Sequence, residues 1–177
     1  AGCIRYAGHH VGDHFSVQAN MMLTDEVVPA MRDAYTSARG PLPERLLAAL
    51  EAAQAAGGDI RGRQSAAMLV VNVHSSGQPW NDVVADLRVD DHPEPLEELR
   101  RLLILRRAYH AMSQATDLAR QGDIQSALVG GAAARELAPD NLEIAFWGAV
   151  AVALSGQMAE ATGAFDQLFA IDPNWAE

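Results

Sequence analysis

The stretch GGDIRGRQSAAMLVV, residues 57–71, joins a glycine-rich loop to an apolar run. The run continues to residue 73 as SAAMLVVNV and is apolar at successive positions, as in a strand that is covered on both faces. A turn before such a strand needs one or two glycines, whereas this one also carries an acid, two arginines and a glutamine. The stretch therefore predicts a buried strand with a polar cluster at its mouth.

That cluster consists of Asp59, Arg61, Arg63 and Gln64. In one interpretation it lines a pocket in which the guanidinium groups bind a carboxylate or an amide of a substrate. In the other, a salt bridge between Asp59 and an arginine holds the loop onto the sheet. The sequence alone leaves both interpretations open.

The flanking segments add further strands and helices. Residues 15–20, FSVQAN, and residues 83–91, VVADLRVDD, alternate apolar and polar side chains, which predicts two half-buried strands. Helical spacing occurs in residues 27–38 and again in residues 41–56, where proline stands at the start and Gly57 follows the end. Three strands and two helices predict an α+β layer with the helices over one face of a sheet.

The second half of the chain repeats itself. Gly122, Ala127, Leu137 and Pro139 recur as Gly156, Ala161, Ile171 and Pro173, each 34 positions later. This period, with glycine at a turn, alanine on the second helix and a terminal proline, is the tetratricopeptide pattern. A helical pattern from residue 96 to about residue 121 links the two regions. We therefore predict an α+β domain over residues 1–95, then a helical linker with two tetratricopeptide-like repeats over residues 96–177.

Composition limits the classes of partner. The 177 residues carry a formal net charge of −10, and an acidic surface repels phosphate backbones and anionic lipids. No apolar stretch approaches the roughly 20 residues that span a bilayer. Cys3 is the single cysteine, which excludes an intramolecular disulfide and suits a reducing compartment. We interpret it as a structural thiol, and we expect a soluble, cytoplasmic protein that binds neither nucleic acid nor membranes.

Three blocks followed by these helices carry a family resemblance: AGHHVGDHFSVQANMM, GGDIRGRQSAAMLVV and DLRVDDHPEPLEELRRLL. From Cys3 to about Leu103, the chain resembles the bacterial and archaeal family known as domain of unknown function 1028, whose fold is like that of the N-terminal-nucleophile hydrolases. The resemblance implies a partial αββα sandwich, of which this chain supplies the later part. The opening strands, where a Thr, Ser or Cys nucleophile would stand, are expected outside the chain.

The resemblance also implies site residues. Asn20 is the candidate catalytic residue, because an asparagine side chain near the nucleophile can stabilise an oxyanion. The candidates for substrate binding are His9, Gln18, Asp59, Arg61, Arg63 and Gln64. Family members usually read Gln-Gly-Asn where this chain has Gln18-Ala19-Asn20. A strand surface that faces solvent explains the polar side chains of residues 16–20 equally well.

Two further polar groups have simpler interpretations. HHVGDH, residues 9–14, contains three histidines but lacks the helical i, i+4 spacing of a zinc-binding pair, so we expect no metal. Asp86, Arg88 and Asp90 alternate along one predicted strand, which is typical of an exposed face with balanced charges.

Two functions fit these patterns, and a degenerate family member that binds no ligand is a third alternative. The leading hypothesis is the C-terminal part of an amide-bond hydrolase of the N-terminal-nucleophile type, which acts without a cofactor on a small amide-containing substrate or a peptide. With its nucleophile outside the chain, the chain by itself is expected to be inactive. The alternative is a non-catalytic interaction protein, whose tetratricopeptide-like helices bind a peptide, a cell-wall fragment or a protein partner in a concave groove. A homo-oligomer is compatible with either function.

Overall fold

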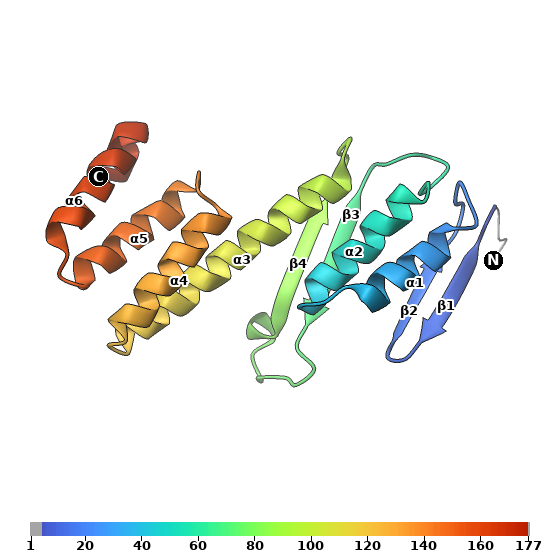
Figure 1. The fold of residues 1–177 in the computed structure, drawn as a ribbon, viewed down its shortest axis with the longest axis horizontal. Helices are drawn as coiled ribbons and strands as arrows, with labels where there is room; N and C mark the ends of the chain where they lie inside the picture. Colours follow the sequence, from blue (N-terminus) through green and yellow to red (C-terminus); the bar gives the residue numbers. More distant parts are fainter. Residues whose placement is uncertain (1–4, 177) are drawn as a thin grey trace. The chain divides into compact units, whose positions relative to one another are not determined.

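The computed structural model describes residues 5–176 and divides into two compact units, with unit 1 ending at Leu103 and unit 2 beginning at Ile104 (Figure 1). This division falls within the long helix α3 (Pro95–Arg120), whose first turns belong to unit 1. The described residues form six α-helices and two small antiparallel sheets, so the predicted α+β class is confirmed. Among them, no helix is both long and apolar enough to cross a membrane.

Unit 1 consists of two β-hairpins, each followed by helices. Its elements are β1 (Gly8–Gly12), β2 (Phe15–Ala19), α1 (Val27–Ser37), α2 (Leu42–Ala55), β3 (Ala66–Val71), the 3-10 turn η1 (Pro79–Asn81), β4 (Val83–Val89) and the start of α3. The strands β2, β3 and β4 and the helices α1 and α2 confirm the elements predicted from periodicity. The strand β1 was not predicted, because its two glycines and two histidines carry little strand propensity; its pairing with β2 in a hairpin supplies the hydrogen bonds.

The strands form two separate sheets, β1–β2 and β3–β4, so the expectation of a single sheet is wrong. No ladder joins β2 to β3. A cavity of about 490 Å³ lies between them instead, lined by Phe15–Gln18 of β2, Ala67–Leu69 of β3 and apolar side chains of α1 and α2. Without backbone hydrogen bonds across this space, packing against the helices holds each hairpin in place.

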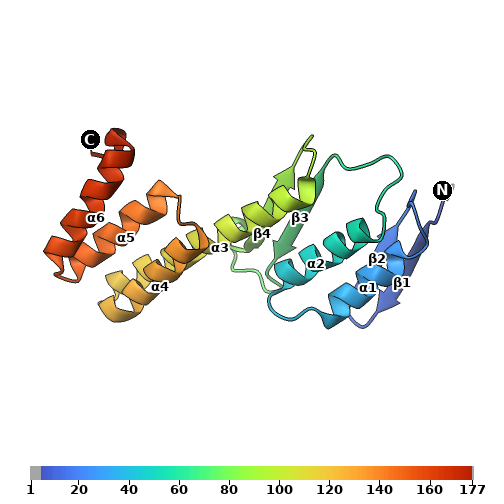
Figure 2. The same ribbon diagram turned by 45° about the horizontal axis from the view of Figure 1, so that its top comes forward.

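One face of β3–β4 is covered by α2 and the start of α3 (Figures 1 and 2). Their buried core consists of Leu47, Met68, Val70, Ala85, Val89, Leu99 and Leu103. The other face is open, since Leu69 and Val71 are 62% and 54% exposed. The prediction that residues 65–73 are covered on both faces is therefore wrong. Apolar residues make up this open face on β3, whereas β4 contributes Asp86 and Arg88 to it.

Aromatic contacts hold α1 and α2 near the first hairpin. The ring of Phe15 lies 4.6 Å from the ring of Tyr35 on α1, measured between centroids. On the helix that follows, the Arg45 guanidinium lies 4.1 Å from the same tyrosine ring centroid and donates to Tyr35 O at 3.2 Å. A cation over an aromatic face is attracted by the ring quadrupole, so Arg45 links α2 to α1.

Unit 2 consists of helical hairpins. After α3 come α4 (Ile124–Leu137), α5 (Leu142–Leu154), α6 (Met158–Ile171) and the 3-10 turn η2 (Pro173–Ala176). The bounds of α4 and α6 differ by 34 positions, as the sequence period predicts. Gly122 and Gly156 precede these helices with φ of +88° and +85°, in the left-handed region that favours glycine. Ala127 and Ala161 are both buried, 1% exposed, where the paired helices pack.

Candidate functional site

The polar cluster before β3 is held by two neighbouring loops. The loop after β2 and the loop after α2 are joined by backbone hydrogen bonds from Leu23 N to Gly58 O and from Ile60 N to Met21 O, both 2.9 Å long. Gly58 has φ +65°, and a Cβ built on it would lie 2.8 Å from Gln54 Nε2. Glycine adopts this left-handed φ without strain and leaves room for the Gln54 side chain against the backbone.

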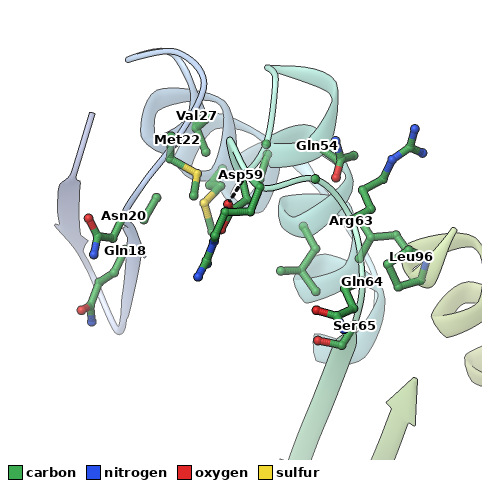
Figure 3. A pocket seen from close by; sticks show the side chains of 18 residues that line it. Gln18, Asn20, Met22, Val27, Gln54, Asp59, Arg63, Gln64, Ser65 and Leu96 are labelled. Carbon is green, nitrogen blue, oxygen red and sulfur yellow. Dashed lines mark hydrogen bonds and ion pairs between the residues drawn. The ribbon is translucent and has the colours of Figure 1, made fainter. Parts of the chain in front are cut away.

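These loops border a cavity of about 560 Å³ (Figure 3). Its polar lining consists of Gln18, Asn20, Gln54, Asp59, Arg61, Arg63, Gln64 and Ser65. Its larger apolar side chains are Met22, Val27, Met31, Leu50 and Leu96. In Figure 3, Gln18 and Asn20 lie on one side, at the end of β2, and Gln64 and Ser65 lie on the other, at the start of β3. The cavity therefore opens between the two hairpins.

Asp59 and Arg61 form a closed pair within one loop. Asp59 Oδ1 accepts from Arg61 N at 2.8 Å and from Arg61 Nε at 2.9 Å, and Asp59 Oδ2 accepts from Arg61 Nη2 at 2.6 Å. These side-chain and backbone hydrogen bonds from Arg61 lower the pKa of Asp59 to about 2. The internal salt bridge, which is one of the two interpretations of the sequence, is thus present. The same two residues line a cavity, as the other interpretation expects.

Arg63 is paired too, with Glu94 in the segment before α3. That segment is tied to the cavity loop by a hydrogen bond from His92 N to Gln64 O at 2.8 Å. Within it, Glu94 N donates to His92 Nδ1 at 3.0 Å, which orients the imidazole. The Asp59–Arg61 pair thus lies within the cavity loop, whereas Arg63 of the lining pairs across 31 residues of sequence with Glu94, which is outside the lining.

Six of the seven residues predicted for the site line this one cavity: Gln18, Asn20, Asp59, Arg61, Arg63 and Gln64. His9 is exposed on β1 opposite Gln18 and does not line the cavity, so a role for it stays a prediction. The oxyanion role of Asn20 also stays a prediction. Sequence reasoning missed Gln54 and Glu94. The position of Gln54, one turn before Gly57 and Gly58, was the available signal, whereas no local pattern points to Glu94.

The remaining polar groups lie elsewhere. Asp86 pairs with Arg88 on the same strand at 3.3 Å, and both side chains are exposed, as expected for a charge-balanced face. His14 lies in the turn of the first hairpin, 3.4 Å from Asp13. Across residues 5–176, no group of three His, Cys, Asp or Glu side chains converges in a geometry that would hold a metal ion. Cys3 lies outside the described residues.

Unit 2 has its own surface hollows between α3 and α5. Two adjoining cavities of about 280 and 230 Å³ share Met112, Thr116, Arg120 and Trp147. Trp147 is 44% exposed, although it belongs to a largely apolar helix. A partly exposed tryptophan beside an apolar floor is typical of a contact surface.

The match to a protein family covers more than half of the chain. The model of a family of unknown function, DUF1028, matches residues 1–99. The chain belongs to the DUF1028 family. A search among curated proteins found no match. Among solved structures, the crystal structure of protein SPO2555 from Silicibacter pomeroyi, described as a DUF1028 protein, is 34% identical with a TM-score of 0.47. That match covers 56% of this chain and 39% of the SPO2555 chain.

The cavity lies entirely within the DUF1028 match, because its lining residues run from Gln18 to Leu96. The helical hairpins from α4 onward lie beyond it. The match therefore includes the cavity and leaves out the helical hairpins.

Proposed function

We propose that the 560 Å³ cavity binds a small ligand that carries amide groups. The supporting observation is that four carboxamide side chains, Gln18, Asn20, Gln54 and Gln64, line it. Each offers an accepting oxygen and a donating NH₂, and an amide ligand presents the same two kinds of group in return. The apolar side chains beside them suit the carbon skeleton of such a ligand, as in most small-molecule sites.

The proposal extends to amide-bond hydrolysis by the longer protein. In it, the fold is a partial N-terminal-nucleophile-hydrolase-like sandwich and Asn20 contacts the developing oxyanion. The nucleophile is proposed to come from outside this chain. Of the described lining residues, Ser65 alone carries a hydroxyl, and no histidine lines the cavity to activate it as a base. The chain spans 39% of the length of SPO2555.

Binding is tested by titrating the ¹⁵N-labelled chain with N-acetyl-L-alanine N-methylamide and following the side-chain NH₂ signals. We expect saturable shifts at Asn20, Gln54 and Gln64. Gln64→Leu should weaken binding at least threefold, whereas Gln125→Leu, on the exposed surface of α4, should not. Shifts that grow linearly with the probe, or that spread over both units, would contradict the proposal.

Hydrolysis is tested with the same chain. Incubation with N-acyl amino acid amides should release no amine, because the cavity binds without a nucleophile. Release of amine that is lost in Ser65→Ala would contradict the placement of the nucleophile outside the chain.

A second candidate function is peptide binding by unit 2. The observation that favours it is the hollow between α3 and α5, where Met112 and the half-exposed Trp147 line both cavities. We propose that these hairpins act as tetratricopeptide-like repeats and that the hollow receives an apolar side chain of a peptide. Peptides selected from a random library should shift the Trp147 indole signal and lose affinity in Trp147→Ala. Trp175→Ala, a change outside these cavities, is the matched control, and an equal loss there would contradict the groove.

A further inference from the structure

We infer that the cavity of unit 1 selects uncharged amide ligands over carboxylates, because the guanidinium groups that border it are already paired with carboxylates of the chain. This inference rests on the proposed function and specifies its class of ligand. It differs from the simplest interpretation of the sequence, in which arginines before a strand bind an anion.

The first pair leaves little attraction for a second anion. Arg61 donates from Nε and Nη2 to the two oxygens of Asp59, which is the two-point geometry that a carboxylate ligand would need. A ligand carboxylate that approached this guanidinium would meet the negative charge of Asp59 beside it. Asp59 remains charged at neutral pH, since its pKa is about 2. An uncharged carbonyl oxygen still accepts from the other N–H groups of the guanidinium without that repulsion.

The second cation, Arg63, lines the cavity and is paired with a carboxylate outside the lining. Glu94 pairs with Arg63, and the segment that carries Glu94 is attached to the cavity loop by the hydrogen bond from His92 N to Gln64 O. Both cations among the described lining residues are therefore neutralised by neighbours of opposite charge. A carboxylate would lose part of its hydration there without gaining an unpaired cation, which is unfavourable.

The carboxamides provide the complementary attraction. Among the described residues, none of the side chains of Gln18, Asn20, Gln54 and Gln64 forms a hydrogen bond with another part of the chain. Their donors and acceptors are thus available to a ligand without breaking contacts within the protein. With both arginines paired to carboxylates, the polar part of the lining is close to neutral, which matches an amide better than an ion.

Two probes that share one skeleton test this selectivity. N-acetyl-L-alanine N-methylamide is uncharged, and N-acetyl-L-alanine is a carboxylate at pH 7. Dissociation constants come from ¹H–¹⁵N spectra of the 177-residue chain at constant ionic strength. For the natural sequence, we expect the amide to bind at least tenfold more tightly than the carboxylate.

Releasing a guanidinium should change the preference. Asp59→Asn removes the negative charge and keeps an oxygen that accepts from Arg61 N, so the ratio of the two dissociation constants should shift at least tenfold toward the carboxylate. Asp33→Asn is the matched control, because it breaks the 2.7 Å pair with Arg32 on α1, outside the cavity. Its ratio should equal that of the natural sequence. If Asp59→Asn unfolds the chain, Glu94→Gln makes the same test by releasing Arg63.

Three results would overturn the inference. Equal binding of the two probes by the natural sequence, or tighter binding of the carboxylate, contradicts the selectivity while leaving an amide site in place. An unchanged ratio in both Asp59→Asn and Glu94→Gln contradicts its cause. Absence of saturable binding of either probe to any of these proteins overturns the proposed function, and this inference with it.

Discussion

The hydroxyl of Tyr109 donates a 2.8 Å hydrogen bond to Glu143 Oε2, and these two residues stand 34 positions apart at equivalent places in the two helical hairpins. The same hydroxyl accepts from Asn141 Nδ2 at 3.2 Å. Asn141 in turn caps α5, since its Oδ1 accepts from Ile144 N at 3.0 Å. The Tyr109 hydroxyl thus connects α3 to the beginning of α5. Two residues at equivalent positions of the 34-residue period are therefore in direct contact.

Removing that hydroxyl should weaken unit 2. We expect Tyr109→Phe to lower the free energy of unfolding by about 0.5–1.5 kcal/mol, because two hydrogen bonds are lost at a partly exposed site. Urea denaturation followed by tryptophan fluorescence measures the change. Tyr35→Phe is the control, because within the described residues the Tyr35 hydroxyl forms no hydrogen bond. Equal losses in the two variants would contradict the role of the Tyr109 contact.

The glycines inside the helices of unit 2 should respond differently to alanine. A Cβ at Gly163 would meet no atom within 4 Å, so Gly163→Ala should stabilise α6 by about 0.5–1 kcal/mol through helix propensity. A Cβ at Gly130 would lie 3.1 Å from Ala115 Cβ, where α4 packs on α3. Gly130→Ala should therefore raise the stability of the chain less than Gly163→Ala does, or lower it. Thermal unfolding of both variants gives the order, and a larger gain at Gly130 would contradict the close packing.

Replacing a large side chain by alanine should lower stability more on the covered face of β3–β4 than on the open face. Leu99 is 0% exposed in the core between α3 and the sheet, so Leu99→Ala should cost about 2–5 kcal/mol. Leu69 is 62% exposed on the opposite face, and Leu69→Ala should change stability by no more than about 0.5 kcal/mol. Urea denaturation of the two variant chains, compared with the natural sequence, measures both changes. A large cost at Leu69 would show that its face is covered in solution.

The Asp59–Arg61 pair should make stability depend on pH in the acid range. The pKa of Asp59 is lowered from 3.8 to about 2 in the folded chain, so the unfolded chain binds more protons between these values. The contribution is complete above about pH 4 and is lost as the pH falls through about 2. Because Arg61 is largely exposed, we expect no more than about 1 kcal/mol. Denaturation between pH 5 and pH 2 should show a steeper fall for the natural sequence than for Asp59→Asn, and parallel curves would contradict the pairing.

Local patterns predicted most of the elements. Alternation located β2 and β4, and helical spacing with proline at the start and Gly57 after the end located α2. The 34-residue period located α4 and α6. Each of these helices follows a turn that favours glycine and packs closely through a buried alanine, so the same residue types recur at the same spacing. The cluster of Asp59 and Arg61 was also visible, since its members are neighbours in sequence.

Long-range features were beyond such patterns. Whether β2 pairs with β3 depends on tertiary packing, because a cavity lined by α1 and α2 separates the two strands, and no window of sequence encodes that separation. The apolar run of β3 resembled a strand covered on both faces, yet Leu69 lies in the open. The partner of Arg63 is Glu94, 31 residues away, and only the folded chain shows that the arginine before β3 is neutralised. This pairing is one of the observations behind the proposed preference for an uncharged ligand.

The methionine methyl groups give the most direct test of the central claim, that this cavity receives an uncharged amide. Four of the six methionines line the cavities of the chain. Met22 lines only the 560 Å³ cavity, Met68 lines only the 490 Å³ cavity, and Met31 lines both. Met112 lines the hollows of unit 2. The measurement is a titration of the chain, ¹³C-labelled at the methionine methyls, with N-acetyl-L-alanine N-methylamide. We predict saturable shifts at Met22 and Met31 with Met68 and Met112 unchanged. Shifts at Met68 or Met112 without Met22, or no saturable shift at any methionine, would contradict the account.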